Sequence, residues 1–140
     1  ALRSQAEMQN VRRRAEIDVE KAHKFALEKF VKELLPVADS LEKAVESTEG
    51  QEGASELVAS IREGAEMTLS LFMSSLKKFN VEQVNPVGGP FDPQQHEAMF
   101  EAPVPGTKAG EIIQVSAEGF YLYDRLLRPA QVGVSSMPAS

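Results

Sequence analysis

The stretch AEMQNVRRRAEIDVEKAHKFALEKFVKELLPVADSLEKA, residues 6 to 44, decides the fold of this chain. It contains no glycine and a single proline, and most of its residues are strong helix formers. Its apolar positions recur three and four residues apart, which is typical of one face of a helix. We therefore expect one long helix over residues 1 to 47. At Pro36 a backbone donor is missing, which predicts a kink or a short break.

The length of this helix predicts that it protrudes from the rest of the molecule. A helix of about 45 residues is about 70 Å long, whereas a globule of this size is about 35 to 40 Å across. Over its first half the apolar stripe follows an eleven-residue period, which predicts a nearly straight or slightly right-handed helix pair. A second copy of the chain is expected to cover the stripe in a parallel homodimer. The predicted dimerisation residues here are Met8, Val11, Ala15, Val19, Ala22, Ala26, Phe30, Leu34 and Leu41.

A second helix is expected after TEGQEGAS, residues 48 to 55, which has the composition of a turn. Ser55 is expected to cap this helix, and the helical apolar period continues to Asn80. Two such helices from each of two chains predict a four-helix bundle at the centre of the dimer. The predicted dimerisation residues of the second helix are Leu69, Phe72 and Leu76.

Beyond Asn80, short apolar runs alternate with turn sequences rich in glycine and proline. The expected strands are VEQV (81–84), EAMFEAPV (97–104), EIIQV (111–115), GFYLYDRLL (119–127) and QVGVS (131–135). Pro129 predicts an edge strand or a bulge beside it. The chain is thus predicted to be α+β, with two helices for dimerisation over residues 1–80 and a small all-β domain over residues 81–140.

Composition excludes several classes of protein. The chain has no cysteine, so it has no disulfide, no thiolate nucleophile and no cysteine metal site. It has no run of eighteen apolar residues, so no membrane span is predicted, and we expect a cytoplasmic protein. Residues 1–48 carry nine acidic and nine basic residues, a balance that does not favour binding to nucleic acid.

The strongest catalytic candidate is His96, within FDPQQHEAMF. In an extended backbone Glu97 would point to the opposite face. In a helical one Asp92 would come within reach, but no nucleophile lies close in sequence. His23 has no ligand partner one helical turn away. We therefore expect no catalytic residue, no metal and no cofactor, and a structural or contact role for His96.

The strongest basic feature is the run Arg12, Arg13 and Arg14. Three consecutive residues of a helix point about 100° apart, so they cannot all lie in the same contact between paired helices. One interpretation is a solvated face paired with nearby acidic residues, namely Glu16, Glu20 and Glu28. The other is a docking site that uses the forked guanidinium groups.

Two motifs and one helix carry a resemblance to a known family. FDPQQHEAM (91–99), followed after nineteen residues by GFYLYDRLLRPAQVGV (119–134), closely resembles the signature of the GrpE family, the nucleotide exchange factors of DnaK-type chaperones. The helical stretch quoted above is similar to the most recognisable helix of that family. The resemblance implies a homodimer with paired long helices, a four-helix bundle and one β-domain per subunit. It also implies that one β-domain binds the nucleotide-binding domain of the chaperone and holds its cleft open, so that ADP leaves without any bond chemistry.

Residue by residue, the resemblance implies chaperone contacts by Arg12, Arg13 and Lys21 on the long helix. On the β-domain it implies contacts by Arg125 and Val134, with Phe91 a weaker match. It places the long helix near the substrate-binding part of the chaperone. Family members usually carry an acidic segment before this helix, whereas the chain opens at Ala1 inside the helical pattern, so we expect that segment to have been removed.

The small residues of the stripe bury little area per turn, so the paired helices are expected to melt before the bundle. Heating would then lower exchange activity reversibly. Two other classes of function remain open. One is a structural coiled-coil adaptor that displays the β-domain to some other protein. The other is a basic-helix nucleic-acid binder, whose affinity would fall steeply with salt.

Overall fold

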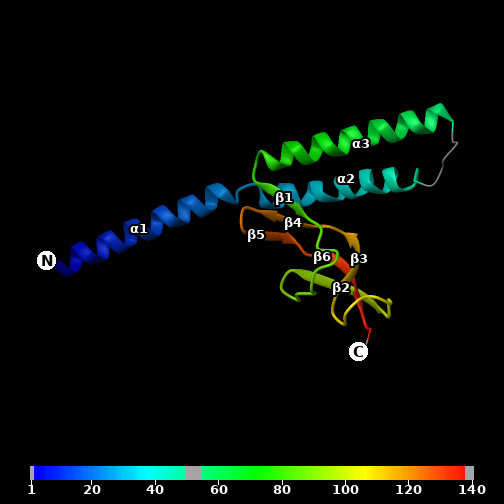
Figure 1. Cartoon of the computed structure of the whole chain (residues 1–140). Helices are drawn as coiled ribbons and strands as arrows, with labels where there is room; N and C mark the ends of the chain where they lie inside the picture. Colours follow the sequence, from blue (N-terminus) through cyan, green and yellow to red (C-terminus); the bar gives the residue numbers. More distant parts are fainter. Residues whose placement is uncertain (1, 50–54, 138–140) are drawn as a thin grey trace.

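The computed structural model describes residues 2–49 and 55–137. Within these ranges, helices come first and strands follow. The helices are α1 (Leu2–Lys24), α2 (Glu28–Glu46) and α3 (Glu56–Lys77). The strands are β1 (Val81–Val84), β2 (His96–Ala102), β3 (Ile112–Ala117), β4 (Gly119–Leu122), β5 (Arg125–Arg128) and β6 (Ala130–Ser135). Figure 1 shows α1 extending far beyond the rest, while α2 and α3 run side by side above the strands. The predicted α+β class is confirmed.

The long N-terminal helix is interrupted at residues 25–27, and the break predicted at Pro36 is absent. α2 continues through Pro36 because buried residues hold it on both sides: Leu35 is 1% exposed and Ala38 is 0% exposed. Pro36 itself is exposed, so water can bond the carbonyl oxygen that loses its donor. The single predicted helix is therefore two helices, which follow one another along nearly the same line in Figure 1.

The helical hairpin of α2 and α3 is tied together at its far end. The side chain of Ser55 accepts a hydrogen bond from the N–H of Val58 at 3.5 Å, which confirms the predicted cap. Arg62 of α3 donates from Nε to Thr48 Oγ1 at 2.8 Å and from Nη2 to the Thr48 carbonyl oxygen. The turn predicted at 48–55 falls largely on residues 50–54, which lie outside the described residues.

The strands form two three-stranded sheets. In the first sheet β4 lies between β1 and β5, and both pairs are antiparallel. In the second sheet β6 lies between β2, with which it is parallel, and β3, with which it is antiparallel. The run GFYLYDRLL, predicted as one strand, is the β4–β5 hairpin, and Tyr123 takes a φ of 55° in its turn. Pro129 follows the edge strand β5, as predicted.

Two apolar clusters stabilise the fold. The first joins helices and sheet, and its buried members are Val31, Leu35, Leu76, Val81, Phe120, Leu122 and Leu127. The second lies within the other sheet and comprises Ile112, Ala130, Val132 and Val134. Since the first cluster crosses residue 80, no separate core marks the predicted division there, and that division stays a prediction. α1 has no buried residue at all.

Candidate functional site

The tip of the β4–β5 hairpin rests on the joint between α1 and α2. Arg125 Nη1 donates a hydrogen bond to Glu28 Oε2 at 2.8 Å, and the Arg125 guanidinium carbon lies 3.7 Å from the centre of the Phe25 ring. The Phe25 ring also meets the Tyr123 ring edge to face, with centroids 6.1 Å apart. The amino group of Lys24 lies 5.1 Å from the Tyr123 ring centre. The joint and the hairpin tip therefore form one cluster of cations and aromatic rings.

Arg125 combines a fixed position with access to solvent, since 44% of its side chain is exposed. Its partner Glu28 also lies 3.5 Å from Lys32 Nζ. The hydrogen bond from Arg125, followed by the charges of Arg125 and Lys32, holds the pKa of Glu28 below its ordinary value despite some desolvation. Glu28 is therefore ionised at neutral pH and forms an ion pair with Arg125.

Sequence reasoning missed Glu28 and Phe25 as neighbours of Arg125. Glu28 is separated from Arg125 by 97 positions, so no local pattern connects them. Phe25 stands in a stretch that is helical by composition, and nothing in the sequence marks it as the end of a helix.

The basic residues predicted to contact a partner form no ion pair within the described residues. Arg12, Arg13 and Lys21 are all exposed, and no ion pair forms at Arg12, Arg13 or Arg14 in the part of the chain that the structure describes. Glu20 pairs instead with Lys24 at 3.8 Å. The arginine run is therefore a solvated face, as one interpretation has it, but the expected pairs with nearby glutamates do not form among the described residues. Its role as a docking site stays a prediction.

The other two predicted contacts in the β-domain lie inside it. Val134 is only 5% exposed and belongs to the second apolar cluster, against which half-buried Phe91 packs. Burial leaves little of the Val134 side chain for a partner, so the structure gives it a packing role in β6. Phe91 also packs against His96, with ring centroids 6.0 Å apart.

His96 closes the loop that precedes β2. Its Nδ1 accepts a hydrogen bond from the N–H of Asp92 at 3.0 Å, and its own N–H donates to the Asp92 carbonyl oxygen at 2.8 Å. The Asp92 carboxylate accepts from the N–H of Gln94 and from the side chain of Gln95. The predicted structural role of His96 is confirmed.

The predicted dimerisation residues fall into three groups by exposure. On α1 and the start of α2 they are exposed, with Met8, Val11, Val19 and Phe30 at 61–69%. Half-buried members are Leu34, Leu41, Leu69 and Phe72. Leu76, at 8% exposed, instead packs in the first apolar cluster of its own chain. The structure adds exposed leucines and isoleucine on α3 that the prediction did not include, namely Leu57, Ile61 and Leu71.

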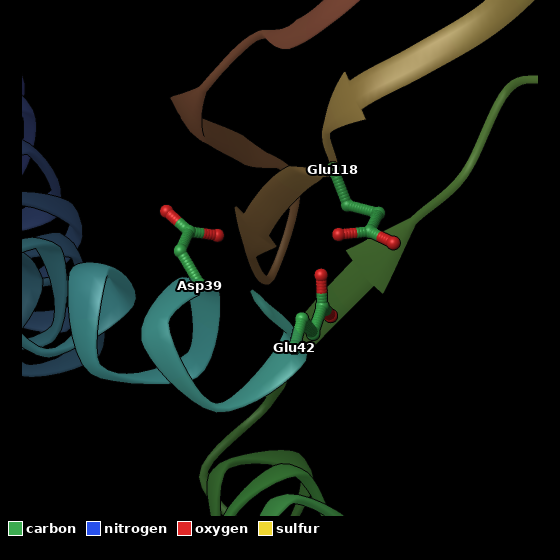
Figure 2. Close-up of side chains that lie close together, drawn as sticks. All are labelled: Asp39, Glu42 and Glu118. Carbon is green, nitrogen blue, oxygen red and sulfur yellow. The ribbon is translucent and has the colours of Figure 1, made fainter. Parts of the chain in front are cut away.

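A group of three carboxylates lies where α2 meets the sheets (Figure 2). Asp39 and Glu42 of α2 and Glu118, between β3 and β4, each offer an oxygen within 4.8 Å of the others. Arg128 donates to Asp39 from both terminal nitrogens, at 2.5 and 2.7 Å, and Gln83 donates to Glu42 at 2.8 Å. Burial, a hydrogen bond with Glu118 and the neighbouring carboxylates raise the pKa of Glu42 to about 7. The Arg128 guanidinium, and below pH 7 a proton on Glu42, thus offset part of the negative charge.

Among the described helices, none is both long enough and apolar enough to cross a membrane.

Comparison with known proteins gives one consistent result. The family model of GrpE matches residues 1–136. "Protein GrpE" of Teredinibacter turnerae is 53% identical over 135 residues, which cover 96% of this chain and 70% of the relative. "Protein GrpE" of Pseudomonas putida is 50% identical over 140 residues, covering all of this chain and 74% of the relative. "Protein GrpE" of Hydrogenovibrio crunogenus is 50% identical over 135 residues, covering 96% of this chain and 71% of the relative.

Proposed function

The chain belongs to the GrpE family, and from that membership we propose how it acts on a DnaK-type chaperone. Members of this family are co-chaperones that promote nucleotide exchange, and they are not enzymes. In our proposal, one β-domain binds the nucleotide-binding domain of the chaperone, opens its cleft and accelerates the release of ADP. The observation that carries the proposal is the family match over residues 1–136, which spans the helices and every strand through β6.

The proposed mechanism needs no catalytic group. If the β-domain binds the open, nucleotide-free conformation of the chaperone more tightly than the closed one, it shifts the population toward the open form. Linkage then requires that the β-domain and ADP weaken each other's binding by the same factor. A thousandfold loss of ADP affinity corresponds to about 4 kcal/mol of differential binding. A few well-placed side chains can supply that amount.

Arg125 is the central contact in this proposal, because it is a partly exposed guanidinium at the tip of a hairpin. Its geometry suits a carboxylate on the chaperone. Arg12, Arg13 and Lys21 are proposed to contact the chaperone along α1, near its substrate-binding part. Phe91 and Val134 pack inside the β-domain. In this proposal they stabilise, from the interior of the domain, the surface that contacts the chaperone.

We further propose that the protein is a homodimer. The exposed apolar residues of α1 would pair with those of a second copy, and the α2–α3 hairpins of two chains would form a four-helix bundle. Leu57, Ile61 and Leu71 support this, since at 100° per residue they lie within an arc of about 80° on α3. In this proposal residues 1–80 serve dimerisation and residues 81–140 serve chaperone binding. Heating would unfold the paired α1 helices first and so reduce the rate of nucleotide exchange. The protein is proposed to act in the cytoplasm.

The test is to measure the affinity of this protein for a DnaK-type chaperone by calorimetry, without nucleotide and with saturating ADP. If the protein promotes exchange, its affinity for the chaperone should fall strongly when ADP is present. The factor should equal the one by which the protein weakens the binding of ADP to the chaperone. Equal affinity with and without ADP would contradict the proposed exchange activity and favour a structural coiled-coil adaptor. Binding to DNA that falls steeply with salt would favour the nucleic-acid binder instead.

A further inference from the structure

The Arg125 side chain is held from two directions by the helix joint. Glu28 accepts a hydrogen bond from its Nη1, and the Phe25 ring lies against the plane of the guanidinium. Glu28 begins α2 and Phe25 lies in the interruption just before it, whereas Arg125 begins β5. A guanidinium has five N–H donors, and among the described residues only the bond to Glu28 forms. The remaining donors are free for an acceptor outside the chain.

We propose that Glu28 is a positioning residue, which orients the Arg125 guanidinium on the Phe25 ring so that its free donors meet a carboxylate of the chaperone. This inference rests on the proposed function, in which Arg125 contacts the chaperone. An unrestrained arginine loses rotamer freedom when a partner binds it, and that loss weakens binding. An arginine already held in its binding orientation loses much less, so Glu28 strengthens the complex without touching the chaperone.

The surroundings of Glu28 suit this role. Its side chain is 22% exposed, against 44% for Arg125, so the carboxylate is the more fixed of the two groups. Lys32 lies 3.5 Å from the other Glu28 oxygen and steadies the carboxylate from the next turn of α2. Glu28 also stands in the first turn of α2, where the helix dipole favours a negative charge.

The same contacts connect α1 and α2 to the β-domain. Phe25 lies in the interruption between α1 and α2, and it meets both Tyr123 and Arg125 of the hairpin. A change in the joint therefore moves the ring on which the contact arginine rests. On this account the interruption at 25–27 aligns the chaperone-binding hairpin, and Glu28 fixes that alignment.

The experiment titrates the protein against a DnaK-type chaperone loaded with a fluorescent ADP analogue and records the release rate. Glu28→Ala is expected to raise the half-saturating concentration about three- to tenfold and to leave the maximal rate unchanged. Glu28→Gln keeps an acceptor oxygen and should show a smaller increase. Glu33→Ala is the matched control, since it removes an exposed glutamate of the same helix that forms no ion pair among the described residues. In an Arg125→Ala background, Glu28→Ala should have no further effect.

The outcomes separate this inference from the proposed function. If Arg125→Ala leaves release unchanged, the proposed contact itself is wrong. If Arg125→Ala weakens binding and Glu28→Ala does not, or if Glu28→Ala weakens both backgrounds equally, Glu28 does not act through Arg125 and the inference is overturned. Tighter binding by Glu28→Ala would also overturn it, because Glu28 would then compete with the chaperone for Arg125.

Discussion

At the scale of single residues, Arg128 connects the first sheet to the helices. It donates to both oxygens of Asp39 on α2, and its Nε donates to the carbonyl oxygen of Glu118 at 3.0 Å. Its guanidinium also lies 5.0 Å from the centre of the buried Phe120 ring. No other cation of the described residues forms an ion pair with the carboxylate group of Figure 2.

Arg128→Ala should lower the free energy of unfolding by about 2 to 3 kcal/mol, because it leaves half-buried carboxylates without their counter-charge. Urea denaturation followed by circular dichroism measures this change. Lys108→Ala, which alters an exposed lysine with no ion pair among the described residues, is the control. Equal urea midpoints of unfolding for Arg128→Ala and Lys108→Ala would contradict the stabilising role of Arg128.

Glu42 makes stability depend on pH. Its pKa is raised from 4.5 to about 7 in the folded chain, so the folded state holds this proton more tightly than the unfolded state. The resulting stabilisation is complete below pH 4.5 and is lost as the pH rises toward 7. Glu42→Gln, which stays neutral, should therefore be more stable than the original chain at high pH, by about 1 to 2 kcal/mol for a half-buried group.

The measurement is urea denaturation from pH 4 to pH 8. The advantage of Glu42→Gln should shrink as the pH falls from 7 and disappear below 4.5, where Glu42 is protonated in the unfolded chain as well. Glu46→Gln, on the exposed end of α2, is the control variant. A constant difference between Glu42→Gln and the original chain across this range would contradict the raised pKa of Glu42.

Residue roles were predictable where partners are close in sequence. The bonds of His96 reach Asp92, four positions away, and the sequence had already placed Asp92 within reach of His96 if the segment were helical. Arg128 and Asp39 are 89 positions apart, and Arg125 and Glu28 are 97 apart. Only folding brings these charges together, so composition and spacing could not pair them.

At the scale of elements, periodicity and caps predicted most of the helices and strands. Ser55 marks the start of α3, and the short apolar runs beyond Asn80 mark four of the six strands separately and the other two, β4 and β5, as one run. The β4–β5 hairpin was missed because its turn, Tyr123-Asp124, lacks the glycine or asparagine that usually supplies a positive φ. The joint at 25–27 was missed because tertiary contacts with the hairpin override a helical composition.

α1 should be the first element to melt. It buries no residue in its own chain, so in the proposed dimer its helicity depends on a second copy. Circular dichroism at 222 nm should show a low-temperature step of about a third of the helical signal, because α1 supplies 23 helical residues against 19 in α2 and 22 in α3. Exchange activity should fall over the same temperatures and return on cooling. A single unfolding transition would contradict this account.

At the scale of the whole molecule, the exposed apolar residues predict a dimer. Leu71 is 69% exposed on the same side of α3 as Leu57 and Ile61. Leu71→Glu should therefore shift the protein from dimer to monomer, as measured by light scattering during gel filtration. Ala59→Glu places the same charge on another side of α3 and should leave the dimer intact. A monomer in the original chain, or a dimer unaffected by Leu71→Glu, would contradict the proposed bundle.

The central claim is that this protein opens a chaperone's nucleotide cleft. The most direct test is stopped-flow release of a fluorescent ADP analogue from a DnaK-type chaperone, in the presence and absence of saturating protein. The account predicts release faster by orders of magnitude, with the acceleration reduced by Arg125→Ala. An unchanged release rate, measured with a chaperone that the protein demonstrably binds, would contradict it.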